Sequence, residues 1–177
     1  ELERVCRAYR LPCVSGKDSM KNDYGSGPEK ISIPPTLLFS LFGDHPDVRQ
    51  TATSDFKFSG DRIYLVGTSN QELGASELAF MMTESGKVDG IGGRVPQLPH
   101  PEQNLAMYRS LSTAIRAGIV RTAHDCSEGG LAVALAEMCI GGRLGASVDI
   151  DGTGDGDVWG RLWGESLGRF VVAVSPD

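Results

Sequence analysis

The sequence predicts a layered α+β (α/β) domain, and two observations support this fold class. Between residues 62 and 174, apolar segments of strand length alternate with segments of helical periodicity. The connections are short, so neighbouring elements can pack as layers around one core. Residues 43–61 show little periodicity. We therefore expect a boundary between two units near residue 50, which gives segments 1–50 and 51–177.

The first segment predicts one helix followed by short strands. Apolar residues recur at helical spacing over residues 1–10. The strands expected after this helix cover residues 11–14, 30–33 and 36–42. Pro34 and Pro35 separate the last two strands and force an edge or a break there, because proline cannot donate to a sheet.

The second segment predicts strands and helices in alternation. The expected strands cover residues 62–67, 119–120, 146–150 and 170–174, and the expected helices residues 73–82, 102–115 and 131–140. The strand at 62–67 is too continuously apolar to be half exposed. The helix at 131–140 is apolar nearly all round, so both elements are expected to be buried. Gly118 is expected to end the helix before it.

The composition is that of an ordinary globular protein. Hydrophobic residues make up 40% of the chain and charged residues 23%, and no apolar run is long enough to cross a bilayer, which excludes a membrane span. The net charge is -6, and the acidic excess lies in residues 51–177, which argues against nucleic-acid binding. The four cysteines show no zinc-finger or CxxC spacing, so we expect reduced thiols in a cytoplasmic protein.

The first candidate site is the polar loop 15–19, which follows an expected strand. Gly16 allows backbone amides to face an anion, Lys17 supplies a positive charge, and Ser19 supplies a hydroxyl donor. This pattern suits phosphate, although its spacing differs from that of a Walker A loop. A solvated turn is at least as good an interpretation.

The second candidate site is the turn 124–130 before the apolar helix. Asp125 suits Mg²⁺, Ser127 suits a phosphate oxygen, and two adjacent glycines at a helix start suggest a close approach to the backbone. The alternative is that Asp125 or Ser127 caps the helix. His124 is better read as a structural histidine.

The third candidate site precedes the last strand. Glu165 and Ser166 could meet a ligand there, or Glu165 and Arg169 could form a local ion pair, which is the simpler interpretation. The acidic segment 149–157 superficially suggests a calcium loop, but it lacks the glutamate that such a loop places at position twelve.

Six segments resemble one family in the same order along the chain. They are SGKDSMKN (15–22), KISIPPTLL (30–38), DFKFSGDRIYLVG (55–67), ELGASE (72–77), HDCSEGGLAVALAEM (124–138) and GESLGRFVV (164–172). Together they resemble the large, synthetase subunit of phosphoribosylformylglycinamidine synthase. This is a purine-biosynthesis ligase of the aminoimidazole ribonucleotide synthetase superfamily.

The resemblance implies a fold and a reaction. The fold is the aminoimidazole ribonucleotide synthetase-like C-terminal domain, a mixed sheet flanked by helices, over 51–177, preceded by the tail of an N-terminal-type domain over 1–50. In the family reaction, ATP activates the formamide oxygen of formylglycinamide ribonucleotide. Ammonia from a glutaminase subunit or fused domain then displaces it. The missing half of the same chain is a further implied partner, whereas nucleic acid and membrane are not.

The resemblance also implies binding roles at the first two sites. A loop that borders ATP and substrate matches Gly16, Lys17 and Ser19, and an auxiliary nucleotide site matches Asp125, through Mg²⁺, and Ser127. Short forms of the family carry asparagine, a magnesium ligand, where this chain has Lys17. An ammonium group cannot ligate a cation, so Lys17 is expected to contact phosphate directly.

A corner that touches substrate in the other tandem copy of the family matches Glu165 and Ser166. No catalytic residue is assigned, because the catalytic histidine and most metal carboxylates of the family match no segment of this chain. We therefore expect the chain alone to be inactive. The competing interpretation is a non-catalytic structural or nucleotide-binding module, whose glycines serve turns only.

Overall fold

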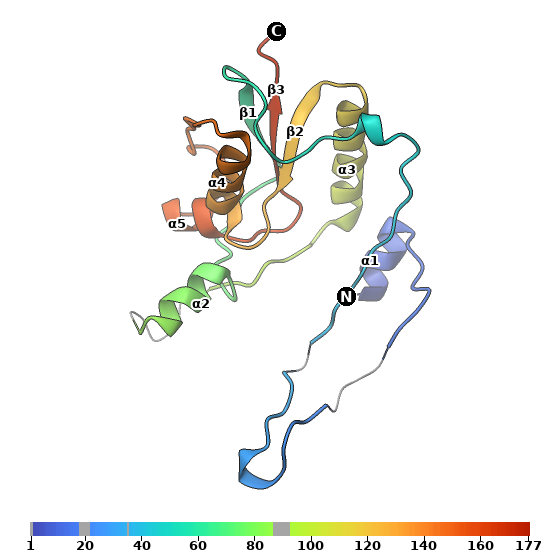
Figure 1. Cartoon of the computed structure of the whole chain (residues 1–177), viewed down its shortest axis with the longest axis vertical. Helices are drawn as coiled ribbons and strands as arrows, with labels where there is room; N and C mark the ends of the chain where they lie inside the picture. The colour runs from blue at the N-terminus through green and yellow to red at the C-terminus, as the bar shows by residue number, and fades with distance from the viewer. Residues whose placement is uncertain (1, 18–21, 35, 87–92) are drawn as a thin grey trace. The chain divides into compact units, whose positions relative to one another are not determined.

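The computed structural model describes residues 2–17, 22–34, 36–86 and 93–177 (Figure 1). The chain divides into two compact units, Glu1–Pro46 and Asp47–Asp177, which we call unit 1 and unit 2. In the described ranges, no helix is long and apolar enough to cross a membrane.

The described residues of unit 1 form one α-helix and little other regular structure. Helix α1, Leu2–Tyr9, confirms the helix expected over residues 1–10. The strands expected at 11–14, 30–33 and 36–42 are coil in the described residues, apart from an isolated bridge between Tyr24 and Ile31. A strand is stable only when a neighbour pairs with it, and the described part of unit 1 offers none to these segments.

Unit 2 contains a three-stranded sheet in the order β1-β3-β2. Its strands are β1, Arg62–Val66, β2, Val120–Asp125, and β3, Phe170–Val174. Both pairings with the central strand β3 are antiparallel. The parallel component of the expected mixed sheet is confined to two isolated bridges, Thr53–Thr122 and Ser69–Gly154.

The strand order corrects two expectations. Strand β1 lies at an edge, and its residues are exposed or half-buried, with Tyr64 49% exposed, because only one of its sides is paired. The expectation that this strand is buried is therefore wrong. The short strand expected at 119–120 extends to Asp125, because its whole length pairs with β3.

Four α-helices complete the part of unit 2 that the structure describes. They are α2, Glu77–Glu84, α3, Pro101–Arg116, α4, Gly130–Gly142, and α5, Val158–Trp163. Helices α3 and α4 confirm the sequence prediction. Helix α2 begins later than expected because Ser76 caps it, accepting a hydrogen bond from the amide of Ala79 (3.2 Å). The sequence did not predict α5, and it wrongly predicted a strand at 146–150, which is coil.

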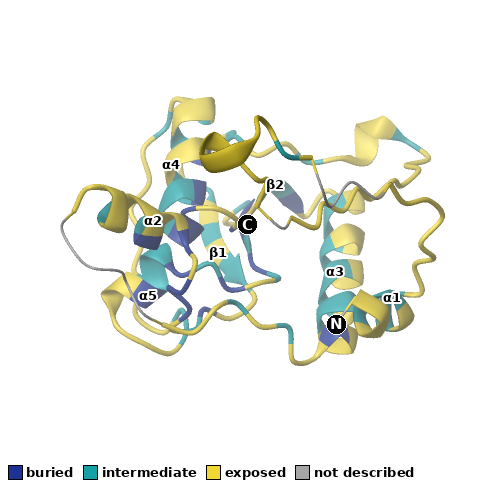
Figure 2. Ribbon diagram, turned by 90° about the horizontal axis from the view of Figure 1, so that it is seen from below, coloured by how far each residue is buried: buried dark blue, intermediate teal, exposed yellow. Residues whose placement is uncertain are grey.

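Helices α3 and α4 cover opposite faces of the sheet (Figure 1). The main core lies on the α4 face, where buried residues concentrate (Figure 2). It contains Phe56, Cys126, Leu131, Ala134, Met138, Val171 and Ala173. On the other face, the rings of Tyr108 and Phe170 meet edge to face at 5.8 Å. Ile140 of α4 is 77% exposed, so α4 is buried along one side only.

Candidate functional site

The turn between β2 and α4 brings the second candidate site together. Strand β2 ends at Asp125, and the amide of Cys126 donates to the carbonyl of Arg169 (2.9 Å), which anchors the start of the turn to β3. Gly129 and Gly130 both have left-handed backbones, with φ of 76° and 64°. A Cβ atom on Gly130 would lie 2.5 Å from a carbonyl oxygen, so only glycine fits.

Glu165 joins this turn to helix α2. Its Oε1 atom accepts hydrogen bonds from the amide of Gly129 (2.9 Å) and from the amide of Glu77 (2.7 Å). The amide of Gly130 donates to the carbonyl of Ser127 (3.0 Å). The two glycine amides that the sequence offered to a phosphate are therefore satisfied within the chain, and one carboxylate supports the first turns of two helices.

Asp125 and Ser127 do not cap helix α4. The N-cap is Gly129, and no side chain makes the cap hydrogen bond. The hydroxyl of Ser127 instead donates to Oδ2 of Asp125, in a very short contact, and the side chain of Asp125 is 59% exposed. The capping alternative is therefore wrong, and the carboxylate at the end of β2 remains open to solvent.

His124 is held by an acidic residue of α4. Its Nε2 atom lies 3.1 Å from Oε2 of Glu137, and its Nδ1 atom lies 2.7 Å from the carbonyl oxygen of Asp125. With both ring nitrogens engaged, His124 positions the strand end against the helix. This fits the structural role expected from the sequence.

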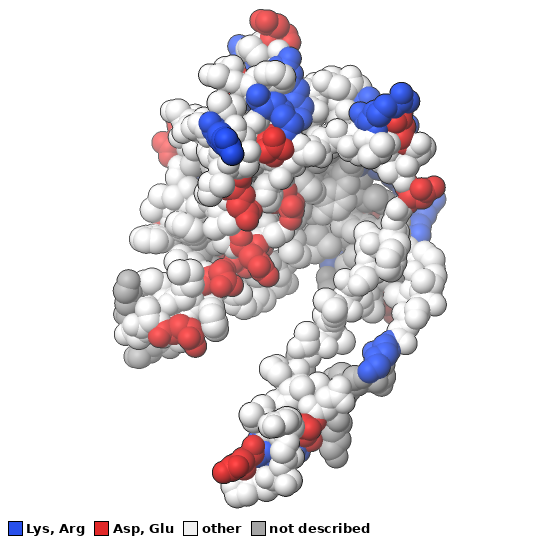
Figure 3. All heavy atoms as spheres, viewed as in Figure 1, with Lys and Arg blue, Asp and Glu red and all other residues white. Residues whose placement is uncertain are grey.

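A cavity of about 360 Å³ opens beside the turn. It is lined by Glu77, His124, Asp125, Ser127, Glu128, Gly129, Val133, Ala134 and Glu137. Acidic side chains gather between α4 and α2 on the face seen in Figure 3. These carboxylates repel a phosphate, and a cation bound with the phosphate offsets that repulsion. Asp125 offers the hard oxygen that Mg²⁺ prefers, although no described cluster of three or more His, Cys, Asp or Glu side chains is arranged for a metal.

Glu165 and Ser166 lie in a buried corner next to the turn. Ser166 is 1% exposed, and its hydroxyl oxygen accepts a hydrogen bond from the amide of Asn70 (2.9 Å). The charge of Glu165 acts on Arg169, but the close contacts of the Arg169 guanidinium are made with other groups. Arg169 donates to the carbonyl of Ser166 (3.0 Å) and to the hydroxyl of Ser69 (2.8 Å). Within this chain the corner is a packing element.

The sequence did not predict the burial of two charged residues in this corner. Arg169 and Glu72 are each 1% exposed. Burial lowers the pKa of Arg169, and nearby groups that include Glu72 oppose this effect. The carboxylate of Glu72 accepts a hydrogen bond from the amide of Gln97 (3.2 Å). The one signal in the sequence was that both residues stand within glycine-containing segments. The backbones of these segments approach closely in the structure, where the amide of Glu165 donates to the carbonyl of Glu72.

The first candidate site belongs to unit 1. Gly16 and Lys17 are exposed residues of a coil segment, and Ser19 lies outside the described residues. The loop does not follow a buried strand, because residues 11–14 are themselves coil.

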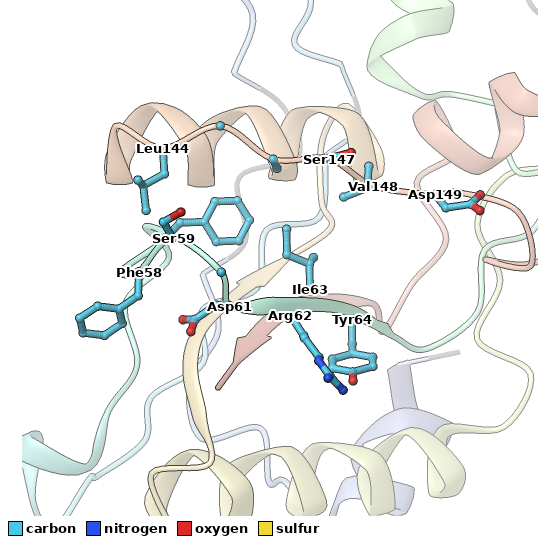
Figure 4. Close-up of a pocket in the computed structure, with 14 residues that line it drawn as sticks. Phe58, Ser59, Asp61, Arg62, Ile63, Tyr64, Leu144, Ser147, Val148 and Asp149 are labelled. Atoms are coloured by element: carbon cyan, nitrogen blue, oxygen red, sulfur yellow. The ribbon is translucent and has the colours of Figure 1, made fainter. Parts of the chain in front are cut away.

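A second cavity in unit 2, of about 590 Å³, lies between β1 and the segment 144–149 (Figure 4). Ile63 points toward the segment that carries Val148, whereas Arg62 and Tyr64 point to the opposite side of the strand. Asp61 is engaged by Arg121 (2.9 Å). This cavity lacks a set of converging reactive groups, so the β2–α4 turn is the better candidate site.

Comparison with known proteins identifies relatives of the chain. Residues 59–177 match the family model of AIR synthase related protein, C-terminal domain. The chain is 37% identical over 177 residues to phosphoribosylformylglycinamidine synthase subunit PurL of Deinococcus radiodurans. The match covers 96% of this chain and 23% of that protein, so the chain spans about a quarter of the length of this relative.

Solved structures of PurL from Thermotoga maritima share the fold. The chain is similar to T. maritima PurL complexed with FGAR, with a TM-score of 0.58 and 23% identity, over 73% of this chain and 22% of that one. It is also similar to T. maritima PurL complexed with ATP, with a TM-score of 0.53 and 22% identity, over 73% of this chain and 20% of that one. The expected fold class is thereby confirmed.

Proposed function

The chain belongs to the family of AIR synthase related proteins, C-terminal domain, and from this membership we propose that it is part of an ATP-dependent ligase of purine biosynthesis. The whole enzyme converts formylglycinamide ribonucleotide to formylglycinamidine ribonucleotide, with ammonia that a glutaminase subunit or fused domain releases from glutamine. The 37% identity to a phosphoribosylformylglycinamidine synthase subunit, over nearly the whole of this chain, supports the proposal. The segments that match no part of this chain supply the catalytic histidine and the remaining metal ligands.

Within that enzyme, the β2–α4 turn binds a magnesium nucleotide. The observation that carries this assignment is the exposed carboxylate of Asp125, which ends a strand, faces an acidic cavity and caps no helix. A carboxylate without a capping role at this point is free to hold a cation. The Asp125 carboxylate would hold Mg²⁺ there, and the ion would supply positive charge against the phosphates of the nucleotide.

Ser127 and Glu165 assist this site in different ways. In the ligand-free turn the Ser127 hydroxyl donates to Asp125. Rotation of that hydroxyl toward a phosphate oxygen frees the Asp125 oxygen for the cation and keeps the hydroxyl hydrogen-bonded. Glu165 holds the turn in place through the amide of Gly129, and Ser166 holds the corner behind it. Both therefore act on the site by positioning its backbone.

The loop of unit 1 is a second contact of the enzyme with ATP and substrate. Gly16, Lys17 and Ser19 carry this role, in which Lys17 contacts phosphate as a positive charge. The exposure of Gly16 and Lys17 supports it, because a ligand can reach both residues from solvent. A lysine side chain supplies positive charge to a phosphate directly, without a metal ion.

The alternative function is a non-catalytic structural or nucleotide-binding module. The left-handed conformation of Gly129 and Gly130 and the internal use of their amides favour it, because turn geometry alone explains both glycines. It differs from the first proposal in what it predicts for Asp125. In a purely structural module, loss of that carboxylate leaves nucleotide content unchanged.

The test uses the full-length protein that carries this chain. Nucleotide released from the purified protein on denaturation is measured for the wild type and for Asp125→Asn, with Asp151→Asn as the matched control at an 88% exposed carboxylate. We expect Asp125→Asn to lose Mg²⁺-dependent nucleotide and Asp151→Asn to retain it. Equal nucleotide content in all three proteins would overturn the assignment. Wild-type protein that forms no product from formylglycinamide ribonucleotide, ATP and ammonia would overturn the ligase itself.

A further inference from the structure

Two cysteines of unit 1 lie in contact, and the proposed nucleotide site uses neither of them. The sulfur atoms of Cys6, on helix α1, and Cys13, shortly after it, are 3.8 Å apart, which is hydrogen-bonding distance for two thiols. Both are free thiols. Cys13 is exposed and Cys6 is half-buried, so one member of the pair meets solvent directly.

The turn that ends α1 fixes this contact. Arg10 has a left-handed backbone, with φ of 57°. The amide of Leu11 donates to the carbonyl of Cys6 (2.9 Å), and the amide of Arg10 donates to the carbonyl of Arg7 (3.3 Å). These two bonds form a Schellman motif, which turns the chain at the helix end. Because the carbonyl of Cys6 accepts the hydrogen bond from Leu11, the chain after the helix turns back toward Cys6, and Cys13 comes into contact with it.

An open groove of about 600 Å³ runs beside the pair and gives a reagent access to it. Arg7 and Arg10 lie in its wall, and Glu3 offsets part of that charge through a contact with Arg7 (2.8 Å). Guanidinium groups in the wall of the groove attract anionic reagents.

We propose that Cys6 and Cys13 form a redox-active dithiol, which closes to an intramolecular disulfide by exchange with an anionic low-molecular-weight disulfide. The thiolate of Cys13 attacks the reagent disulfide, forms a mixed disulfide and releases one reagent thiolate. Cys6 then loses its proton, attacks the sulfur of Cys13 and releases the second thiolate. The dithiol gives up two electrons and two protons, and the reagent becomes two thiols.

The environment of the thiols assigns the order of attack. The pKa of Cys6 is raised by partial burial and by the hydrogen bond and charge of Cys13. Cys6 therefore keeps its proton while the exposed Cys13 attacks first. Cys126 is a contrast within the same chain, because burial raises its pKa to about 11 and leaves it unreactive as a structural thiol.

Glutathione disulfide serves as the probe for this exchange. The reduced chain is incubated with it under native conditions, the remaining thiols are alkylated after unfolding, and the tryptic peptides are mapped by mass spectrometry. Trypsin cleaves after Arg7 and Arg10, so a bond between Cys6 and Cys13 joins two peptides that are otherwise separate. We expect this joined species and a loss of alkylation at both cysteines, while Cys126 and Cys139 remain alkylated.

Two variants sharpen the test. Cys6→Ser should retain glutathione on Cys13, because the second thiol is missing, whereas Cys139→Ser should form the joined peptides as the parent does. Stable glutathione on Cys13 in the parent chain, or a bond from Cys13 to Cys126 or Cys139, would overturn the proposal. So would closure at an equal rate in guanidinium, since the pairing would then reflect closeness in sequence and not the folded turn.

Discussion

The two units of the chain use similar residues to different effect. In unit 2, Val171 and Ala173 of β3 are 1% and 0% exposed, because β3 is paired on both sides and covered by α4. In unit 1, Leu38 and Phe42 belong to an equally apolar run but are 89% and 90% exposed. An apolar run becomes a strand only where a neighbouring strand and a covering helix exist within the same unit.

The same contrast separates the two candidate sites. At the β2–α4 turn, a strand end, a helix start and Glu165 hold Asp125 in a defined place. At the unit 1 loop, Gly16 and Lys17 stand on coil. The site at the β2–α4 turn can therefore be argued from geometry within this chain, whereas the site at the unit 1 loop rests on its residue types and on the family.

Amide hydrogen exchange should show the largest difference between the units. We expect the amides of β3 to exchange at least about a thousandfold more slowly than those of residues 36–42, since only the former require global unfolding to open. Mass spectrometry of peptic fragments resolves the two regions. Comparable protection in both would mean that residues 36–42 are paired in solution and that the two units do not differ in this way.

Truncation of one apolar side chain in each unit should give the next largest difference. Met138 is fully buried, and Met138→Ala should lower the free energy of unfolding by about 2–5 kcal/mol. Leu38→Ala, at an 89% exposed position, should change it by no more than about 0.5 kcal/mol. Urea unfolding followed by circular dichroism measures both. A large loss for Leu38→Ala would show that unit 1 has a core of its own.

The role of Glu165 predicts a smaller effect within unit 2. Glu165→Ala leaves the amides of Gly129 and Glu77 without their acceptor and should cost about 1–3 kcal/mol of unfolding free energy. Glu165→Gln should cost less, because the amide oxygen can still accept. Thermal unfolding compares the two variants. If both are as stable as the wild type, Glu165 is not the link between α2 and α4.

The smallest expected effect is a dependence on acid. The pKa of Asp55 is lowered from 3.8 to about 2, chiefly by its hydrogen bond with the Lys57 ammonium and then by that of the Thr53 hydroxyl. Since the folded pKa is the lower one, Asp55 stabilises the fold above about pH 4, and this contribution disappears as the pH falls toward 2. NMR titration of the Asp55 carboxyl group should give a midpoint near 2. In Lys57→Met the midpoint should rise, and an ordinary midpoint in the parent would contradict the assignment.

Much of the fold of unit 2 could be predicted, and its failures have physical causes. Strand β3 and helices α3 and α4 have strong periodicity and find partners nearby. Apolar and polar residues also alternate over 146–150, yet this segment is coil. Alternation shows which face of a strand would be buried, but a strand also needs a neighbouring strand with which to pair. Helix α5 has only six residues, too few for a periodic signal, and depends on its cap at Asp157.

The candidate site was predictable in part. The close backbone approach at Gly129 and Gly130 was predicted from the sequence, whereas the hydrogen bond of Ser127 to Asp125 was not. The link that Glu165 makes to the turn was not visible, because its carboxylate contacts an amide 36 residues away in the chain. Contacts of that range are set by the packing of α4 against α5 and not by any local pattern.

A metal substitution tests the central claim most directly. Mn²⁺ replaces Mg²⁺ in crystals of the full-length protein with bound nucleotide, and its anomalous scattering locates the cation. We expect a peak at the carboxylate of Asp125, between that side chain and a phosphate, which is lost in Asp125→Asn. A nucleotide-associated peak that lies away from Asp125, or one that persists in Asp125→Asn, would contradict the account.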